Sequence, residues 1–477
     1  MATRPSLTGA WWPQSTYPRA ELPERVLQFG TGMLLRAVCA AAVDAANRQG
    51  RFRGRIVVVQ STPGGRAPDL NTQDGLFTLV ERGLEGGAPI DRTRLVGSIS
   101  RALVADSEWD AVRAVAARPE LQVIVSNVTE AGFRPDGGFP DRLTDLLYHR
   151  FERLPDGPPL FVIPTELVPD NGVRLAEMVD QVAAARARGG GRGGGGATAF
   201  RDWCSRAVRF CSSLVDRITT GAPEMAARAE LEARLGYADA LLTVTEPHCL
   251  WAVAADPDDL RSAFAVDDPP AVIFAPDITF YSERKLRLLN GAHTALAPLA
   301  LLAGVATVRE AAEHPRFGAL LRQILFQEIA PATDLPAGAA DAFARTVLDR
   351  FRNPWLDHRW DVIAANQTAK LRVRVVPSIV AYGVKHGRPP RGLALGCAAY
   401  LRWARSHPAG DGDLGPIERY WGEAETAAAL GARALGDATV WGTDLSQVPG
   451  FVAATTDALV ALERDGPAAA VDEALSP

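Results

Sequence analysis

The chain contains 477 residues, of which 47% are hydrophobic and 22% are charged, and its formal net charge is −5. This is the composition of a globular protein of two or three domains, which can bury a core without disulfides or structural metals. The acidic balance disfavours a nucleic-acid binder, because such proteins usually carry an excess of basic residues. The first 13 residues lack a basic stretch followed by an apolar run, so no secretory signal is expected.

The cysteines and the most apolar stretch both bear on location. The five cysteines show no paired CxxC spacing, so we expect reduced thiols in a cytoplasmic protein. Residues 292–308 are the most apolar stretch, but His293 and Pro298 interrupt it and it is shorter than the ~20 residues that cross a bilayer. We therefore predict a buried helix there and no membrane partner.

Apolar, β-branched runs recur along the first part of the chain. They predict strands buried on both faces of a parallel sheet, at residues 25–30, 55–60, 121–127 and 159–164. A helical pattern over 31–47 joins the first two runs and completes a βαβ unit. The fold class predicted is α/β, with a Rossmann-like, doubly wound domain over residues 1–280.

A glycine pair stands where the first strand meets this helix. Gly30 and Gly32 would let the backbone approach a pyrophosphate, which then sits at the helix N-terminus. Leu35 occupies the place of the third glycine in the full fingerprint, so a simple tight turn is the alternative. The second strand ends at Gln60 instead of an acidic residue, so NAD is expected without excluding NADP.

A low-complexity segment and a change of composition mark the rest of the chain. Residues 186–197 are mostly glycine and arginine, which predicts a mobile surface loop because glycine is costly to order. An RGG-like nucleic-acid segment is the alternative, and the absence of aromatic residues disfavours it. From about residue 281 onward, Ala/Leu/Arg-rich patterns punctuated by prolines predict a mainly α-helical domain over 281–477.

Lysine is rare in this chain. Lys285, Lys370 and Lys385 are the only three, and the other 48 of the 51 basic residues are arginines. A lysine amine can be tuned to lose its proton, whereas an arginine cannot. A lysine that persists in such a chain is therefore a candidate for proton chemistry, and chance survival is the alternative.

One lysine has chemically suitable neighbours. On an α-helix at about 100° per residue, Asn290 lies ~140° and His293 ~80° from Lys285, so all three side chains can reach into one cleft. The amine can exchange a proton with a carbonyl–alcohol pair, the amide can donate to a developing alkoxide, and the imidazole can hold a neighbouring hydroxyl. A solvated lysine, a capping asparagine and a core histidine form the alternative.

Two further charged groups remain open to interpretation. Asp216 and Arg217 lie among apolar residues and could form a structural ion pair or take a functional role. Lys370, Arg372 and Arg374 alternate along the chain and could hold a substrate carboxylate or form a solvated surface. No histidine or cysteine spacing typical of a metal site occurs, so no metal is expected.

The pattern Lys285-x4-Asn290-x2-His293 resembles the signature of the polyol-specific long-chain dehydrogenases, the mannitol dehydrogenase family. The resemblance extends from Val26 to about Pro377. Further segments look like the tagaturonate reductase branch of this family, at residues 70–76, 126–132, 210–218, 289–296 and 328–336.

The resemblance implies a nicotinamide cofactor, no zinc, and an active site between a Rossmann-type and a helical domain. It implies that Lys285 is the general acid/base, that Asn290 stabilises the oxyanion and that His293 binds substrate. Polyol dehydrogenases carry a second amide near the position of Leu167, for which Asn171 is the candidate substitute. The remaining expected site residues are Asp216, Lys370 and Arg374 with Asn171 for the substrate, and Phe29, Gly30, Thr31, Gly32, Met33, Leu34, Asn127 and Thr129 for the cofactor.

The expected function is the NAD-dependent reduction of a keto-uronate, D-tagaturonate to D-altronate, in hexuronate catabolism. A mannitol or other polyol dehydrogenase and a fructuronate reductase are the alternatives within the family. A non-catalytic nucleotide-binding protein is the alternative from another class. The expected partner is a small sugar acid, without nucleic acid or membrane, and the oligomeric state, monomer or dimer, is left open.

Overall fold

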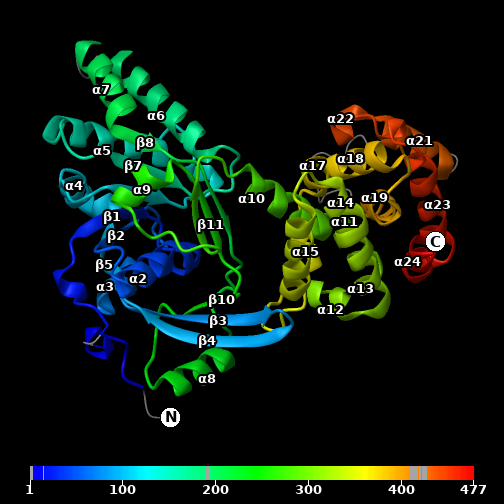
Figure 1. Ribbon diagram of the computed structural model, residues 1–477, viewed down its shortest axis with the longest axis horizontal. Coiled ribbons are helices and arrows are strands. Elements are labelled where there is room, and N and C mark those ends of the chain that lie inside the picture. The colour runs from blue at the N-terminus through cyan, green and yellow to red at the C-terminus, as the bar shows by residue number, and fades with distance from the viewer. Residues whose placement is uncertain are drawn as a thin grey trace. The chain divides into compact units, whose positions relative to one another are not determined.

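The computed structural model describes residues 4–13, 16–188, 194–407, 417, 420–421 and 427–476. The chain forms two compact units (Figure 1), which we call unit 1, Met1–Arg82 with Ile90–Ile278, and unit 2, Gly83–Pro89 with Thr279–Pro477. The mobile loop predicted over residues 186–197 is wrong at both flanks, because 186–188 end the helix α6 (Asn171–Arg188) and 194–197 begin the helix α7 (Gly194–Ala207). Residues 189–193 lie outside the described residues, and the loop stays a prediction there.

Unit 1 is built on a six-stranded sheet whose neighbouring strands are all parallel. The strand order is β5-β2-β1-β6-β7-β8, which is the 3-2-1-4-5-6 order of a doubly wound dinucleotide-binding fold. The predicted α/β class is therefore confirmed. The strands are β1 (Glu24–Phe29), β2 (Arg55–Gln60), β5 (Ile99–Val104), β6 (Val123–Ser126), β7 (Leu160–Pro164) and β8 (Val208–Phe210).

Side-chain alternation along these strands separates two cores. Val26 and Ile56 face one core, whereas Leu27 and Val57 face the other. Because neighbours on a strand point to opposite faces, a sheet covered on both sides requires continuous apolar runs. The helices of unit 1 are α1 (Met33–Leu35), α2 (Ala41–Arg48), α3 (Ala67–Thr72), α4 (Ala105–Ala116), α5 (Phe139–Arg153), α6 (Asn171–Arg188), α7 (Gly194–Ala207), α8 (Met225–Leu235) and α9 (Pro257–Ala263). Helices α4, α5 and α6 cover the Leu27 face, and α2 and α9 cover the Val26 face.

Two small sheets were not predicted. One has the order β10-β3-β4 and the other β12-β11-β9, in which β11 and β9 are antiparallel. Figure 1 shows β3 and β4 as a long hairpin. Its two-residue turn is Gly86-Gly87, and both glycines have positive φ, 60° and 77°. The strands are β3 (Phe77–Glu85), β4 (Ala88–Val96), β9 (Ser213–Asp216), β10 (Thr243–Thr245), β11 (Leu250–Ala254) and β12 (Val272–Ala275).

Unit 2 is helical, as predicted, and its core forms around α11, which contains the most apolar stretch of the chain. Every residue of α11 from Ala292 to Ala300 is buried, which confirms the predicted buried helix. Within the described ranges, no helix is long and apolar enough to cross a membrane. The helices are α10 (Thr279–Arg284), η5 (Lys285–Gly291), α11 (Ala292–Leu302), α12 (Val308–Glu313), α13 (Pro315–Arg322), η6 (Gln323–Ile329), α14 (Ala330–Ala332), α15 (Ala337–Phe351), α16 (Trp360–Ile363), α17 (Gln367–Arg374), α18 (Val376–His386), α19 (Arg391–Ala404), α21 (Ala427–Gly436), α22 (Ala438–Trp441), α23 (Phe451–Arg464) and α24 (Gly466–Leu475).

Among the residues that the structure describes, three helical segments have the wider π-helical winding. They are η3 (Arg36–Ala40), which follows the glycine turn, η5, which begins at Lys285, and η6. A π-helix closes hydrogen bonds between residues five apart, and such turns occur frequently at functional sites. Two of the three π-turns therefore coincide with the segments for which the sequence predicts chemistry.

Candidate active site

The carboxyl ends of β1 and β6 meet where the strand order of the sheet reverses. The Asn127 N–H donates to the Phe29 carbonyl at 3.0 Å. Gly30 has φ +121°, and a Cβ at this position would lie 2.9 Å from the Asn127 carbonyl oxygen, so only glycine fits. Thr129 is exposed on the same loop. This is the point at which doubly wound sheets bind their ligands.

Neither the backbone conformation nor the packing at Gly32 requires a glycine. Its φ is −66°, which any residue can adopt, and no atom lies within 4 Å of an added Cβ. The space beside this residue is therefore open at the start of the helix that follows, and Met33 and Leu34 are only partly buried. An open approach to a helix N-terminus fits a bound pyrophosphate, so the residues present fit a dinucleotide.

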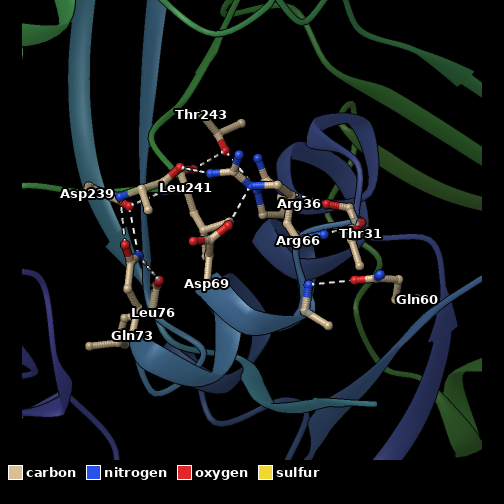
Figure 2. A network of polar contacts seen from close by, with 12 residues as sticks. Thr31, Arg36, Gln60, Arg66, Asp69, Gln73, Leu76, Asp239, Leu241 and Thr243 are labelled. Carbon is tan, nitrogen blue, oxygen red and sulfur yellow. Dashed lines mark hydrogen bonds and ion pairs between the residues drawn. The ribbon is translucent and has the colours of Figure 1, made fainter. Parts of the chain in front are cut away.

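A buried arginine holds the glycine turn in place. Arg36 is 4% exposed, its Nη1 donates to the Thr31 carbonyl at 2.5 Å, and its Nε donates to the Thr243 hydroxyl at 3.0 Å (Figure 2). Among the described residues it forms no ion pair with a carboxylate. Burial lowers the pKa of Arg36 to about 10. A buried cation without a close counter-charge is costly, so an anion bound at this turn would be favoured.

The ends of β6 and β7 are joined by side chains. The Thr165 hydroxyl donates to the Ser126 carbonyl at 2.7 Å, and the Asn127 amide donates to the Thr165 hydroxyl at 3.0 Å. Glu166 accepts hydrogen bonds from the Val128 N–H at 2.9 Å and from the Ser126 hydroxyl at 3.2 Å. Burial raises the pKa of Glu166. These contacts fix the loop that carries the predicted cofactor residue Asn127.

Asp216 and Arg217 take different partners. The Asp216 carboxylate is 2% exposed and lies 3.4 Å from His248 Nε2. Arg217 forms its ion pair with Glu81 and donates from Nε to the Thr245 hydroxyl at 2.9 Å. Consecutive residues at a strand end point to opposite sides, which explains why they separate. Arg217 is therefore structural, and the substrate role expected for Asp216 stays a prediction.

The hydrogen bonds of Asn171 argue against the substrate role expected for it. The residue is 1% exposed at the start of α6, and its amide donates to the carbonyls of Glu166 and Ser213 at 2.9 and 3.0 Å. Its side-chain oxygen accepts from the Ser213 N–H at 2.8 Å. The carboxamide is thus occupied by backbone groups, while Leu167 is 77% exposed. We therefore replace this expectation with a structural role, in which Asn171 joins α6 to β9.

The π-turn η5 brings Asn290 to the face of Lys285. With the α-helical period used in the sequence analysis, the two residues are ~140° apart. In a helix whose hydrogen bonds join residues five apart, they are separated by about one turn and therefore share a face. Asn290 is half-buried, and its carboxamide makes no hydrogen bond to any described residue. His293 follows three residues later on the same side.

His293 lies in an aromatic environment. It is 6% exposed and stacks on Phe351, with ring centroids 4.0 Å apart and planes at 16°. The rings of His358 and Trp360 approach it edge-on at 4.8 and 6.1 Å. Burial, followed by the charge of Arg350, lowers the pKa of His358. The His293 ring is therefore held in a fixed orientation by packing.

The basic residues of α17 divide between two faces, because residues two apart on a helix point apart and residues four apart point together. Arg372 donates to the carbonyls of Val440 and Thr439, and so caps α22. Lys370 Nζ donates to the Ile363 carbonyl at 2.8 Å.

Arg374 extends from α17 to the helix that follows η5. Its Nη1 donates to the Thr294 hydroxyl at 3.5 Å, and burial lowers its pKa. A Cβ on Gly291 would lie 3.1 Å from the Arg374 carbonyl oxygen, so the end of α17 packs closely on η5. The structure therefore brings Arg374 next to the segment that carries Asn290 and His293.

Three of these residues were missed by the sequence analysis. Arg36 stands four residues after Gly32 in the otherwise apolar run Met33–Val43, and a lone cation in such a run was an available signal. Glu166 follows a buried strand at its carboxyl end, where ligand-site residues gather. His248 gave no comparable signal, because its partner Asp216 is 32 residues away in the chain.

The described residues contain no cluster of three or more His, Cys, Asp or Glu side chains that could hold a metal ion. The five cysteines, all within the described ranges, are free thiols. Burial raises the pKa of the Cys397 thiol to about 12, and it raises that of Cys39 further.

Comparisons with known proteins agree across both units. Residues 24–259 match the mannitol dehydrogenase Rossmann domain, and residues 277–463 match the mannitol dehydrogenase C-terminal domain. The chain is 35% identical over 476 residues to the altronate oxidoreductase of Escherichia coli O7:K1 (strain IAI39 / ExPEC), covering 94% of this chain and 96% of that protein. It is 35% identical over 478 residues to the altronate oxidoreductase of E. coli strain K12, with the same coverage.

Solved structures show the same fold. Mannitol 2-dehydrogenase from Pseudomonas fluorescens, in a ternary complex with NAD and D-mannitol, aligns with a TM-score of 0.70 at 24% identity over 99% of this chain and 97% of that chain. D-sorbitol dehydrogenase in substrate-free form aligns with a TM-score of 0.79 at 20% identity over 98% and 100%. The chain therefore belongs to the mannitol dehydrogenase family and is a polyol or uronate dehydrogenase, an oxidoreductase that acts on a CH–OH group.

Proposed function

We propose that the chain reduces a keto-uronate, D-tagaturonate, to D-altronate in hexuronate catabolism, with NADH as reductant. The observation that carries the proposal is the π-helical winding of η5, whose period favours a common side of the helix η5–α11 for Lys285, Asn290 and His293. Arg374 donates to Thr294 of the same helix. The identity to altronate oxidoreductases supports an acidic sugar. The free thiols fit the cytoplasm as the proposed location.

The residues of η5 and α11 supply the proton and the hydrogen bonds of the reduction. The chemistry that a reduced nicotinamide would supply, once bound, is a hydride for the ketone carbon. Lys285, as the ammonium, donates a proton to the ketone oxygen as it becomes an alkoxide, and the product is a secondary alcohol. The Asn290 amide donates a hydrogen bond to the same oxygen, and this bond is strongest when the charge develops. His293 binds a neighbouring hydroxyl.

The substrate carboxylate is assigned to Lys370 and Arg374. These residues are four apart on α17 and share a face of that helix, and cations bind a carboxylate through charge-assisted hydrogen bonds. A neutral polyol offers no carboxylate to either residue. Asp216 is retained as a proposed acceptor for a substrate hydroxyl.

The dinucleotide is assigned to the turn and loop at the switch point of unit 1. The proposed contacts are Phe29, Gly30, Thr31, Gly32, Met33, Leu34, Asn127 and Thr129. The backbone N–H groups around Gly32 would bind the pyrophosphate, and Asn127 and Thr129 follow β6 at the same edge of the sheet. The open space at Gly32 supports this assignment.

The decisive experiment measures NADH oxidation with D-tagaturonate, D-fructuronate and D-fructose. We expect kcat/KM for tagaturonate to exceed that for the neutral ketose by at least about a hundredfold. The neutral ketose would lose the hydrogen bonds of its missing carboxylate to Lys370 and Arg374, and each such charged hydrogen bond contributes about 1.5–3 kcal/mol. A preference for fructuronate would assign the other reductase of the family. A preference for fructose would overturn the acidic substrate.

Lys285→Met tests the proton donor. We expect turnover to disappear while NADH still binds, as measured by nicotinamide fluorescence. The matched control is Lys385→Met, because Lys385 is exposed and its Nζ donates to the Pro331 carbonyl at 2.8 Å. Full activity of Lys285→Met would reject the mechanism.

A further inference from the structure

The three aromatic neighbours of the His293 ring differ in exposure. Phe351 stacks on this ring at 4.0 Å, and Trp360 approaches it edge-on at 6.1 Å. These two side chains are 3% and 0% exposed. His358 approaches the same ring edge-on at 4.8 Å and is only partly buried. Of the three neighbours, His358 is therefore the one that a ligand arriving from solvent can touch.

Backbone pairing determines on which side of the chain His358 lies. The segment 358–360 pairs with the segment 306–308 through two backbone hydrogen bonds, of 2.9 and 3.1 Å, and an antiparallel bridge. Alternate residues of an extended segment point to the same side. His358 and Trp360 therefore share one side, while Arg359 between them is exposed. The backbone thus holds the His358 ring in place without any hydrogen bond from the ring itself.

The His358 imidazole has hydrogen-bonding capacity that the fold does not use. It makes no hydrogen bond to any residue that the structure describes. Burial, followed by the charge of Arg350, lowers the pKa of His358, so at pH 7 the ring is neutral and carries one N–H donor and one acceptor. The indole Nε1 of Trp360 is buried and also makes no hydrogen bond within the described ranges. Buried polar groups normally have partners, so this cluster suits a ligand that offers hydroxyl groups.

We propose that His358 binds the substrate, through a hydrogen bond to a hydroxyl on the carbon next to the one whose hydroxyl His293 binds. The two ring centroids are 4.8 Å apart, so both imidazoles can contact one sugar chain at neighbouring positions. A neutral imidazole can donate to one hydroxyl or accept from it, and the carboxylate stays with Lys370 and Arg374. The inference rests on the proposed function, in which His293 contacts the substrate, and adds a second imidazole to that site.

Two substitutions separate hydrogen bonding from packing. His358→Phe keeps an aromatic ring against His293 and removes both nitrogens, whereas His358→Gln keeps a donor and an acceptor and removes the ring. We expect His358→Phe to raise KM for D-tagaturonate about tenfold with little change in kcat, and His358→Gln to stay within about threefold of the natural protein. The reverse order, or equal effects of the two substitutions, would show a packing role and overturn the inference.

Binding in the absence of turnover provides an independent measurement. Calorimetric titration of D-altronate into the enzyme saturated with NADH should show about tenfold weaker binding for His358→Phe, and unchanged affinity would overturn the inference. The matched control is His314→Phe, because His314 is exposed and approaches Phe317 edge-on at 5.3 Å. This control should change neither KM nor the affinity for altronate. Urea unfolding of each variant verifies that it is folded.

The outcomes also separate this inference from the proposed function. Reduction of tagaturonate that His358→Phe leaves unchanged would reject the substrate contact and retain the reductase. If the natural protein instead prefers D-fructose, the proposed acidic substrate is rejected. The same two variants assayed with fructose then decide the inference, because it depends on hydroxyl groups that both substrates carry.

Discussion

Arg217 donates a hydrogen bond from Nη1 to the carbonyl oxygen of Ala37 at 2.8 Å. Ala37 belongs to η3, the π-turn that follows the glycine turn. Arg217 directly follows β9, a strand of the small sheet β12-β11-β9. The same guanidinium pairs with Glu81 on β3. One buried cation therefore connects the helix that follows the glycine turn to both small sheets.

Loss of this connection should be costly. We expect Arg217→Met to lower the free energy of unfolding by about 3–5 kcal/mol, because it leaves Glu81 largely buried without its partner. Urea unfolding followed by circular dichroism measures the change. Arg234→Met is the control, since it breaks an exposed pair with Asp91 and should cost no more than about 1 kcal/mol. Equal effects of the two variants would contradict this assignment.

The two glycines of the turn should respond differently to alanine. Gly30→Ala forces a side chain into φ +121° and against the Asn127 carbonyl, which should cost about 2–4 kcal/mol of stability. Gly32→Ala meets no protein atom, so stability should be retained. Its methyl group would instead occupy the approach to the helix N-terminus and weaken dinucleotide binding. Thermal unfolding and NADH fluorescence distinguish the two effects, and unchanged NADH affinity in Gly32→Ala would argue against the assigned pyrophosphate position.

Asn290 should act on the chemical step. Its carboxamide has no partner among the described residues, and removing a donor to a developing oxyanion typically lowers kcat by about 10²–10³. We expect this loss for Asn290→Ala, with NADH affinity preserved. Steady-state kinetics separate kcat from KM. A rise in KM alone would make Asn290 a substrate-binding residue instead.

Glu328 should give a characteristic pH dependence of stability. It accepts hydrogen bonds from the N–H groups of Gly392 and Leu393 at 2.7 and 2.9 Å, at the start of α19. Burial raises the pKa of Glu328 in the folded protein. The folded state therefore binds this proton more tightly than the unfolded state does. The contribution of Glu328 to the free energy of unfolding is full below about pH 4.5 and is lost as pH rises through the folded pKa. The stability difference between the natural protein and Glu328→Gln should thus decrease as pH rises from 4 to 8.

Glu310 provides a control of opposite sign. Hydrogen bonds from backbone N–H groups at the start of α12 lower the pKa of Glu310, and the bond from the Thr307 N–H has the largest effect. Its contribution is therefore present above about pH 4.5 and is lost as pH falls through the folded pKa. In urea unfolding, the difference in stability between the natural protein and Glu310→Gln should grow as pH rises. The same slope for both variants would contradict the assigned directions.

The sequence was most informative where burial alone decides the structure. The apolar runs at β1, β2, β6 and β7 predicted parallel strands, because a sheet covered on both faces leaves no room for polar alternation. Strand β5 was missed because Ser100 and Arg101, which are only partly buried, interrupt its apolar run. The β3–β4 hairpin was also missed, although Gly86-Gly87 between two extended runs was a signal for it.

The chemistry of unit 2 was predicted from residue types, and its geometry was not. The α-helical period put Asn290 about 140° from Lys285, and the side chains were still expected to reach one cleft. The closer alignment that a π-turn gives was not predicted, because nothing in the sequence marks a π-turn. The hydrogen bonds of Asn171 depend on Ser213, which is distant in the chain, so its structural role could not be predicted from spacing. The Arg66 N–H donates to the Thr31 hydroxyl, and this contact likewise depends on how two loops meet.

The hydrogen bonds of Lys370 and Lys385 to the carbonyls of Ile363 and Pro331 have a practical consequence. Outside the α-amino group, this chain offers three primary amines to an acylating reagent. Intact-protein mass spectrometry after mild acetylation therefore yields few adducts, and each can be assigned from a single peptide. Protection of Lys285 by bound sugar acid would appear directly as a missing mass increment, which allows ligand occupancy to be followed by covalent labelling.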